Sequence, residues 1–412
     1  MPDIHAILET AWSSTSAAIS VVLVLTYGFF ARKKGLINDE GERNIGKLCT
    51  TIFLPCLLFS EVGPLASWDN LREYWMIIAY AVFFQLVSWG FGVAGVRLLR
   101  LPHWIVPCIV FNNTTSLPLL LLNCLAKAGT IEELLVDGDT TKKALSRGVV
   151  YVLIYSLVAN LARFGFGPHM LKDEKAKEEI HAWTHHETPH QHHAPKDDDE
   201  GEGEEAAGGP EPAPQSEASP LLGEPPKPAD KRWAKRLKRN VKEIMNPPLA
   251  GGLTAALFGV VPFLHRWFFT DDSFLAPLTM SFHNLGQLYA VLQMFVLGAH
   301  LQSKGYARPQ YLALVYLFAF RFAIMPLISS SVVAYVRQHT TVLLDPVFDF
   351  VMIIAPVGPP ALTLAAIVEM AAPGQATITA VATTVVVSYA LAPFVSVGVT
   401  LALYVVEGLN YK

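Results

Sequence analysis

Residues 103–129 have the length of a membrane span, but the middle of this stretch is too polar for a plain one. Small polar side chains interrupt its two apolar runs, namely Asn112, Asn113, Thr114, Thr115 and Ser116. Pro118 follows at once, so a continuous helix would bury these polar groups in hydrocarbon and lose a backbone hydrogen bond. Non-helical backbone is tolerated at membrane depth only where protein or a water-filled cavity surrounds it. The stretch therefore predicts two half-helices joined by a polar break.

A second interrupted stretch lies late in the chain, at residues 347–371. Two apolar halves flank a break whose residues are Ala355, Pro356, Val357, Gly358, Pro359 and Pro360. Two interrupted spans at corresponding places in two halves of a chain indicate an inverted-repeat secondary transporter. In such proteins the substrate lies near the breaks.

The composition supports a membrane protein with many spans. Of 412 residues, 52% are hydrophobic and 16% are charged, whereas soluble domains carry about 25% charged residues. We expect an all-α polytopic fold of ten transmembrane helices, arranged as a five-plus-five inverted repeat with broken, crossing helices 4 and 9. The expected spans are 8–31, 44–63, 73–97, 103–128 and 147–167, then 246–267, 279–300, 309–336, 347–371 and 377–406.

The expected domains follow from this count. Residues 1–167 form the first five-helix repeat, residues 168–244 a disordered linker, and residues 245–412 the second repeat. Basic residues after spans 1, 3 and 7 and before span 6 fall on one side of the membrane. By the positive-inside rule that side is the cytosol, so we expect a cytosolic linker and lumenal termini.

The linker is rich in His, Glu, Asp, Pro and Gly and cannot bury a core. A histidine-rich run at 181–193 predicts either zinc binding or pH sensing, or simply a solvated tract. Residues 217–222 have the form of an acidic dileucine sorting signal, which would direct the protein to a vacuole-like membrane.

No pattern in the sequence indicates an enzyme. There is no P-loop, no nucleophile elbow and no cluster of metal ligands within the apolar segments. We therefore expect no enzymatic activity, no cofactor, no metal in the site and no nucleic-acid partner. The partners we expect are the lipid bilayer and a small organic anion.

The breaks themselves suggest how an anion is held. Each restarted half-helix carries partial positive charge at its N-terminus, which attracts a carboxylate. Neither break contains Asp or Glu, which a sodium- or proton-coupled antiporter of similar plan would be expected to carry there. Pro118 and Pro360 are expected in the first turn of the restarted helices, where a missing N–H costs nothing.

The asparagines leave two roles open. Asn112 and Asn113 can bond the substrate or satisfy and cap the broken helices, while Pro356, Gly358 and Pro359 mainly shape the backbone. The candidate substrate-binding residues are Asn112, Asn113, Thr114, Thr115, Pro118, Pro356, Gly358, Pro359, Pro360 and Arg321.

Arg321 joins this set because it lies inside an expected span, about 18 Å from its cytosolic end at 1.5 Å per residue. That depth is near the middle of a ~30 Å hydrocarbon core. Attraction of the substrate anion and pairing within the bundle are both open, with Asp349 and Glu369 as candidate partners.

On span 7, His283, Asn284, Gln287 and Gln293 either line a cavity or bond between helices. Pro55 and Pro326 are expected to kink their helices.

These features together resemble the auxin efflux carrier family, which includes plant PIN carriers and the endoplasmic-reticulum PIN-like carriers. The resemblance rests on FLPCLLFSEVG, NNTTSLPLLLL, NPPLAGGL and APVGPPA, besides the two halves and the hydrophilic middle. It implies a scaffold of spans 1, 2, 6 and 7 and a transport domain of the other six. It also implies elevator-type transport of amphipathic anions such as indole-3-acetate, and a homodimer.

The PIN-like branch, which this sequence is closer to, implies the endoplasmic reticulum membrane as the location. The alternative hypothesis is a non-transporting scaffold or sensor that acts through the histidine-rich and acidic linker. The sequence leaves open the physiological substrate and the direction and driving force of transport.

Overall fold

The computed structural model describes residues 4–127, 129–136, 138–186, 246–270, 273–302, 310–340, 344–371 and 375–409. Regular secondary structure in these ranges is helical, and the sole strand-like pairing among them is one isolated antiparallel bridge. Residues 1–178 and 244–412 form one compact unit, and residues 179–243 are grouped apart from it. The sorting motif at 217–222 and most of the histidine-rich run lie outside the described residues.

The first half of the chain contains α1 (Ile4–Lys33), α2 (Asp39–Leu48), η1 (Cys49–Phe53), α3 (Leu54–Val62), α4 (Trp68–Glu73), α5 (Trp75–Leu99), α6 (Ile105–Val110), α7 (Ser116–Lys127), η2 (Thr130–Leu134) and α8 (Thr141–His186). The second half contains α10 (Pro247–Val260), α11 (Pro262–Phe269), α12 (Ala276–His300), α13 (Tyr311–Ala319), η3 (Phe320–Ile324), α14 (Met325–His339), α15 (Pro346–Ile354), α16 (Leu364–Ala371), α17 (Gln375–Ala390), η4 (Ala392–Phe394) and α18 (Val395–Glu407).

The predicted all-α membrane protein is confirmed. Four helical stretches of the described chain are long and apolar enough to cross a membrane, and six if each of two bent pairs is one span. The count of ten spans stays a prediction. Helix α8 extends from Thr141 to His186, so it runs past the expected start of the linker at residue 168.

Two prolines that were expected to kink helices each follow a wider helical turn. Directly before Pro55 and Pro326 the chain forms the π-helices η1 and η3, in which Leu54 and Met325 donate to carbonyls five residues back. A proline ring clashes with the carbonyl of the preceding turn and offers no N–H. The extra residue in the wider turn makes room for the ring while the helix continues.

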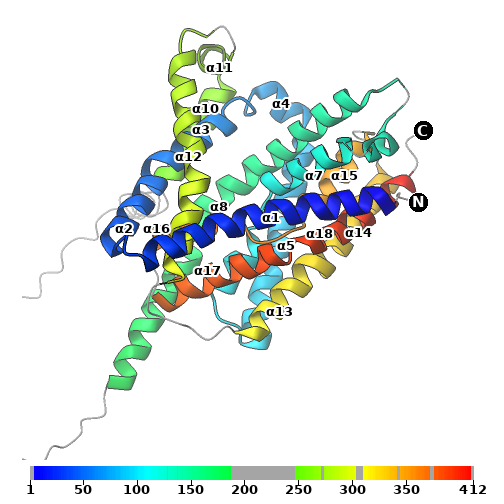
Figure 1. The fold of residues 1–412 in the computed structure, drawn as a ribbon. Coiled ribbons are helices and arrows are strands. Elements are labelled where there is room, and N and C mark those ends of the chain that lie inside the picture. The colour runs from blue at the N-terminus through cyan, green and yellow to red at the C-terminus, as the bar shows by residue number, and fades with distance from the viewer. Residues whose placement is uncertain are drawn as a thin grey trace, which may run out of the picture. The chain divides into compact units, whose positions relative to one another are not determined.

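Helices α1, α3, α10 and α12 form a group packed through glycines, here called the glycine-packed group. Helix α12 packs against α1 and α3, and α3 packs against α10 (Figure 1). A methyl group added at Gly28 would overlap the carbonyl of Phe295, and one at Gly298 would overlap the carbonyl of Leu25. Two more glycines bring backbone against α3, Gly251 of α10 and Gly286 of α12. Small residues that let backbones touch are typical of helix contacts in membranes.

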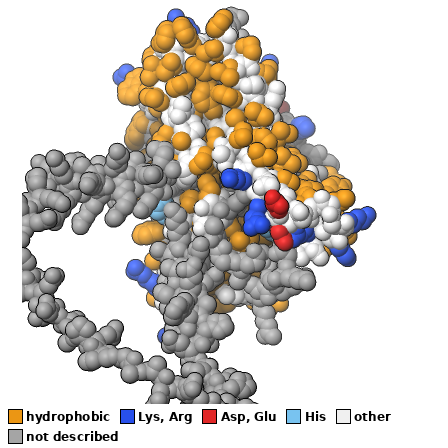
Figure 2. All heavy atoms as spheres, turned by 90° about the vertical axis from the view of Figure 1, so that its left-hand side faces the viewer, with side chains coloured by type: hydrophobic (Ala, Val, Ile, Leu, Met, Phe, Trp, Pro, Cys, Tyr) orange, Lys and Arg blue, Asp and Glu red, His pale blue; other side chains and the backbone are white. Residues whose placement is uncertain are grey.

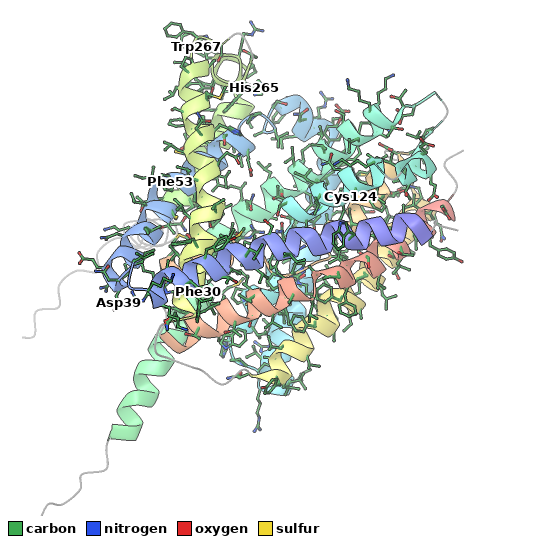
Figure 3. All side chains as sticks on the ribbon, in the orientation of Figure 1. Phe30, Asp39, Phe53, Cys124, His265 and Trp267 are labelled. Carbon is green, nitrogen blue, oxygen red and sulfur yellow. The ribbon has the colours of Figure 1, made fainter. Side chains whose placement is uncertain are left out.

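The outer surface of this group is apolar. Figure 2 shows hydrophobic side chains over much of the upper part of one face. Exposed hydrophobic residues of α10, α12 and the neighbouring α11 include Leu257, Phe263, Trp267, Met280 and Val291. In Figure 3 Trp267 of α11 lies near the top of the view, and Asp39 of α2 lies at the lower left. A continuous apolar surface of this kind is suited to contact with lipid.

Candidate substrate site

Both predicted breaks are present, and they cross each other. Helix α6 ends at Val110, extended backbone follows, and α7 begins at Ser116. The second break separates α15 from α16. Asn113 N–H donates to the Pro359 carbonyl at 2.9 Å, and Ala361 N–H donates to the Phe111 carbonyl at 2.9 Å. These bonds join the breaks as a short antiparallel pair, here called the crossover.

The role expected for Pro360 was wrong, whereas Pro118 lies in the first turn of α7 as expected. Pro360 lies opposite Asn112 in the crossover, before α16 begins at Leu364. In an antiparallel pair, alternate opposed residues exchange no backbone hydrogen bonds. Residue 360 occupies such a position, so its missing N–H leaves no partner unsatisfied.

Asn112 satisfies the opposite break. Its amide Nδ2 donates to the carbonyls of Ala355 at 2.8 Å and Val357 at 3.3 Å, where α15 has ended. Last-turn carbonyls of a helix lack partners within the helix, so this side chain supplies the missing donor. Gly358 follows with φ of 119°, a conformation that side chains other than hydrogen rarely allow.

Asn113 caps α7 and also faces a cavity. Its Oδ1 accepts from the backbone N–H groups of Thr115 at 3.3 Å and Ser116 at 3.1 Å. Its Nδ2 donates to the hydroxyl of Tyr389 at 2.8 Å. Thr114 and Thr115 both bond to the hydroxyl of Ser156 on α8. The polar block is thus held by side chains of α8 and α17.

A cavity of about 150 Å³ lies between the glycine-packed group and the crossover. One wall comes from α3 and α12, and the other from α8, the start of α7 and residues 361–363. Its polar lining includes Asn113, Thr114, Thr115, Asn160, Arg163 and Gln293. Apolar side chains complete the wall, among them Leu54, Leu57, Phe164 and Met294. A mixed lining of this kind suits a ligand with a polar head and an apolar body.

Arg163 is the cation in the cavity wall, and it is only 3% exposed. Its Nη2 donates to the Asn112 carbonyl at 2.8 Å. Its Nη1 donates to Asn160 Oδ1 and to Thr363 Oγ1, each at 2.8 Å. These acceptors are neutral, and the described residues give its Nε no partner. The guanidinium therefore keeps its full charge beside the cavity.

Arg321 is buried on the crossover but is absent from the lining of this cavity. Its Nη1 donates to the Pro356 carbonyl at 3.0 Å, and its Nη2 donates to the Ile109 carbonyl. Asp349, one candidate partner, instead forms a two-point ion pair with Arg337 at 2.7 and 2.8 Å. The side chain of Glu369, the other candidate, lies outside the described residues.

The remaining candidates divide between cavity and surface. Of the polar residues on span 7, Gln293 lines the cavity, while His283, Asn284 and Gln287 are exposed. Pro118 in α7 and the residues of the second break, Pro356, Gly358, Pro359 and Pro360, are not among the lining residues.

Sequence reasoning missed Arg163, because the depth within a span that selected Arg321 did not select it. It lies near the expected end of a span at residue 167, where a basic residue ordinarily marks the membrane edge. Its neighbour Asn160 gave the available signal, since a second polar residue one helical turn away on the same face favours an interior position.

Comparison with known proteins agrees with this architecture. A relative from Saccharomyces cerevisiae, described as an uncharacterized transporter, is 25% identical over 402 residues, covering 90% of each chain. The protein PIN-LIKES 2 of Arabidopsis thaliana is 24% identical over 389 residues, covering 82% of each chain. An uncharacterized transporter of Schizosaccharomyces pombe is 28% identical over 179 residues, only 40% of this chain and 39% of that protein.

The family model described as membrane transport protein matches residues 13–406, nearly the whole chain. The motifs that resembled auxin efflux carriers lie within this match. The chain therefore belongs to the membrane transport protein family, that of the auxin efflux carriers and the PIN-like proteins.

Proposed function

We propose that this transporter moves amphipathic organic anions, such as indole-3-acetate, across an internal membrane. The observation that carries the proposal is the cavity beside the crossover, where a buried guanidinium and a capped helix N-terminus adjoin an apolar wall.

The charges favour an anion. Arg163 contributes a full positive charge, and the N-terminus of α7 at Ser116 contributes a partial one. Charges act more strongly across a small protein cavity than they do in bulk water. Asn113 and the two threonines add amide and hydroxyl groups, which would exchange their hydrogen bonds to Tyr389 and Ser156 for bonds to an entering carboxylate.

The place of the cavity supports an elevator-type motion. It lies between the glycine-packed group, which corresponds to the proposed scaffold, and the crossover, which belongs to the proposed transport domain. At about 150 Å³ the cavity holds a carboxylate with a few carbon atoms, so binding of a larger anion requires its two walls to separate. Displacement of one group along the other would then open the site to alternate sides of the membrane.

The proposed membrane is the endoplasmic reticulum, with a vacuole-like membrane as second choice, the linker cytosolic and both termini lumenal. A homodimer is part of the proposal because the family resemblance implies one. Microscopy of tagged protein tests the location, and a signal mainly at the plasma membrane would contradict both choices.

Uptake of labelled indole-3-acetate and other carboxylates into proteoliposomes tests the function. We expect saturable flux for wild type, strongly reduced flux for Arg163→Gln, and wild-type flux for Arg97→Gln, whose parent side chain is exposed on α5. If no carboxylate shows saturable flux in wild type, the proposal is wrong.

A further inference from the structure

The cavity wall also contains a carboxylate that the proposed anion site does not use. Glu61 lies near the end of α3, half-buried, and lines the cavity together with Arg163. Among the described residues, no hydrogen bond or ion pair joins its carboxylate to another group. The buried Asp345 differs, because Arg147 and Tyr151 bond to its oxygens at 2.9 and 2.7 Å.

An ionised Glu61 would oppose the proposed substrate. Two negative charges confined to one water-poor cavity repel each other far more strongly than they do in bulk water. At separations of several Å and a dielectric constant of about 20, this repulsion reduces affinity by roughly ten- to hundred-fold. A proton on the carboxylate removes the repulsion and leaves a neutral group that donates a hydrogen bond.

We propose that Glu61 is the proton-binding group of this cavity, so that an organic anion binds together with one proton. The inference rests on the proposed anion site. The proton comes from the water that bathes the open cavity and joins a carboxylate oxygen as the anion binds. It returns to water when the anion leaves. Because one positive and one negative charge arrive together, the net charge of the cavity is unchanged by occupancy.

Few other ionisable groups face this carboxylate. Helix α8 presents Arg163 and α12 presents Tyr289, both in the cavity wall. Helix α10 contains no ionisable side chain in its range, and His283 of α12 is exposed. Helix α11, whose phenylalanines touch α3, contains His265 and Arg266, and neither lines the cavity. Glu61 is thus the acidic group in this wall that can exchange a proton with the site.

Isothermal titration of the purified full chain with indole-3-acetate tests the inference. Between pH 5.5 and 8.5 the probe's own carboxyl stays ionised, because such groups titrate near pH 4. Buffers of different ionisation heat report the protons taken up on binding. For wild type we expect uptake of a large fraction of one proton per anion as Glu61 becomes ionised, and an affinity that falls with rising pH until the ten- to hundred-fold loss is complete.

Glu61→Gln should bind without proton uptake, with an affinity independent of pH and equal to that of wild type at low pH. Glu407→Gln provides the matched control, because that side chain is exposed at the end of α18, and it should behave as wild type.

Three results would overturn the inference. The first is binding to wild type without uptake of a proton, and the second is a pH dependence that persists in Glu61→Gln. The third is loss of binding in that variant at every pH while its melting temperature stays unchanged. The third would make Glu61 a direct substrate contact. If wild type binds no carboxylate at any pH, the proposed function fails and this inference fails with it. If wild type binds with an affinity independent of pH, only the inference fails.

Discussion

Two arginines meet the crossover, and they differ in what lies beside them. Arg163 and Arg321 are 3% and 1% exposed, and each donates to backbone carbonyl oxygen at or beside the breaks. Arg321 bonds the carbonyls of Ile109 and Pro356, one from each interrupted stretch, away from the cavity lining. Arg163 bonds one carbonyl and two side chains, and it borders the cavity. An intramembrane arginine can therefore replace missing backbone donors, and only an adjoining cavity gives it access to a ligand.

Arg321→Ala should have the largest effect, and the effect should be on folding. It leaves two buried carbonyls without a charged donor, each worth about 1.5–3 kcal/mol, so we expect a loss of about 3–6 kcal/mol. Thermal melting in detergent without substrate measures it. Arg321→Lys should recover part of the loss, because an ammonium group still donates. An unchanged melting temperature with weakened anion binding would move Arg321 into the substrate site.

Arg163→Gln should act mainly on binding. The amide retains a donor for the Asn112 carbonyl, but the charge beside the cavity is lost. A hydrogen bond to a charged group is worth about 1.5–3 kcal/mol, which corresponds to roughly 10- to 150-fold in affinity for indole-3-acetate. Equilibrium binding measures the change. Equal loss of affinity in the exposed control Arg97→Gln would show that the effect is not local.

Two substitutions at Asn113 and its partner Tyr389 should weaken anion binding by different amounts. Asn113→Ala should weaken anion binding by about 1–3 kcal/mol, or about five- to 150-fold. It also removes a helix cap worth about 1 kcal/mol, and Asn112 cannot replace it because its amide bonds the opposite break. Tyr389→Phe removes only the hydroxyl that holds Asn113, and it should weaken anion binding by about 1 kcal/mol. Wild-type affinity in Asn113→Ala would exclude this residue from the site.

A third arginine, Arg147, differs from Arg163 and Arg321 because it forms ion pairs with carboxylates. Loss of its pair with Asp139 should have the smallest effect on stability. Arg147 bonds Asp139 at 2.6 Å, outside the crossover. This hydrogen bond, with smaller contributions from Thr140 N–H and nearby charge, lowers the pKa of Asp139. Its stabilisation is therefore present above the ordinary carboxyl range near pH 4 and is lost as the pH falls through the lowered pKa.

Asp139→Asn should reduce the neutral-pH stability by about 1 kcal/mol or less, as expected for a partly exposed pair. It should also make the melting temperature depend less on pH in the acidic range. If the melting temperature of the variant varies with acidic pH as it does in wild type, the pair contributes nothing to stability.

The sequence was sufficient to locate the breaks, because polar residues and prolines inside apolar stretches conflict with a continuous helix. It was insufficient to show how the breaks face each other. Pro360 looked like a helix-starting proline until pairing with Asn112 placed it in extended backbone. Arg163 and Glu61 both lie near the ends of expected spans, where charged residues ordinarily meet water or lipid head groups. Their access to one cavity depends on contacts between α3, α8 and α12, which no local pattern encodes.

The contacts between α1 and α12 interlock the two helices at two glycines. Each helix inserts a carbonyl into a space that the other leaves only at a glycine, Gly28 on one side and Gly298 on the other. A shift of one helical turn along the axis of α12 would bring the side chain of Met294 or Leu301, which lie on the same face as Gly298, against the Leu25 carbonyl. The two helices are thus fixed in register and cannot serve as a sliding track. The proposed elevator-type displacement would therefore fall on surfaces without such interlocked glycines, such as the wall of the cavity.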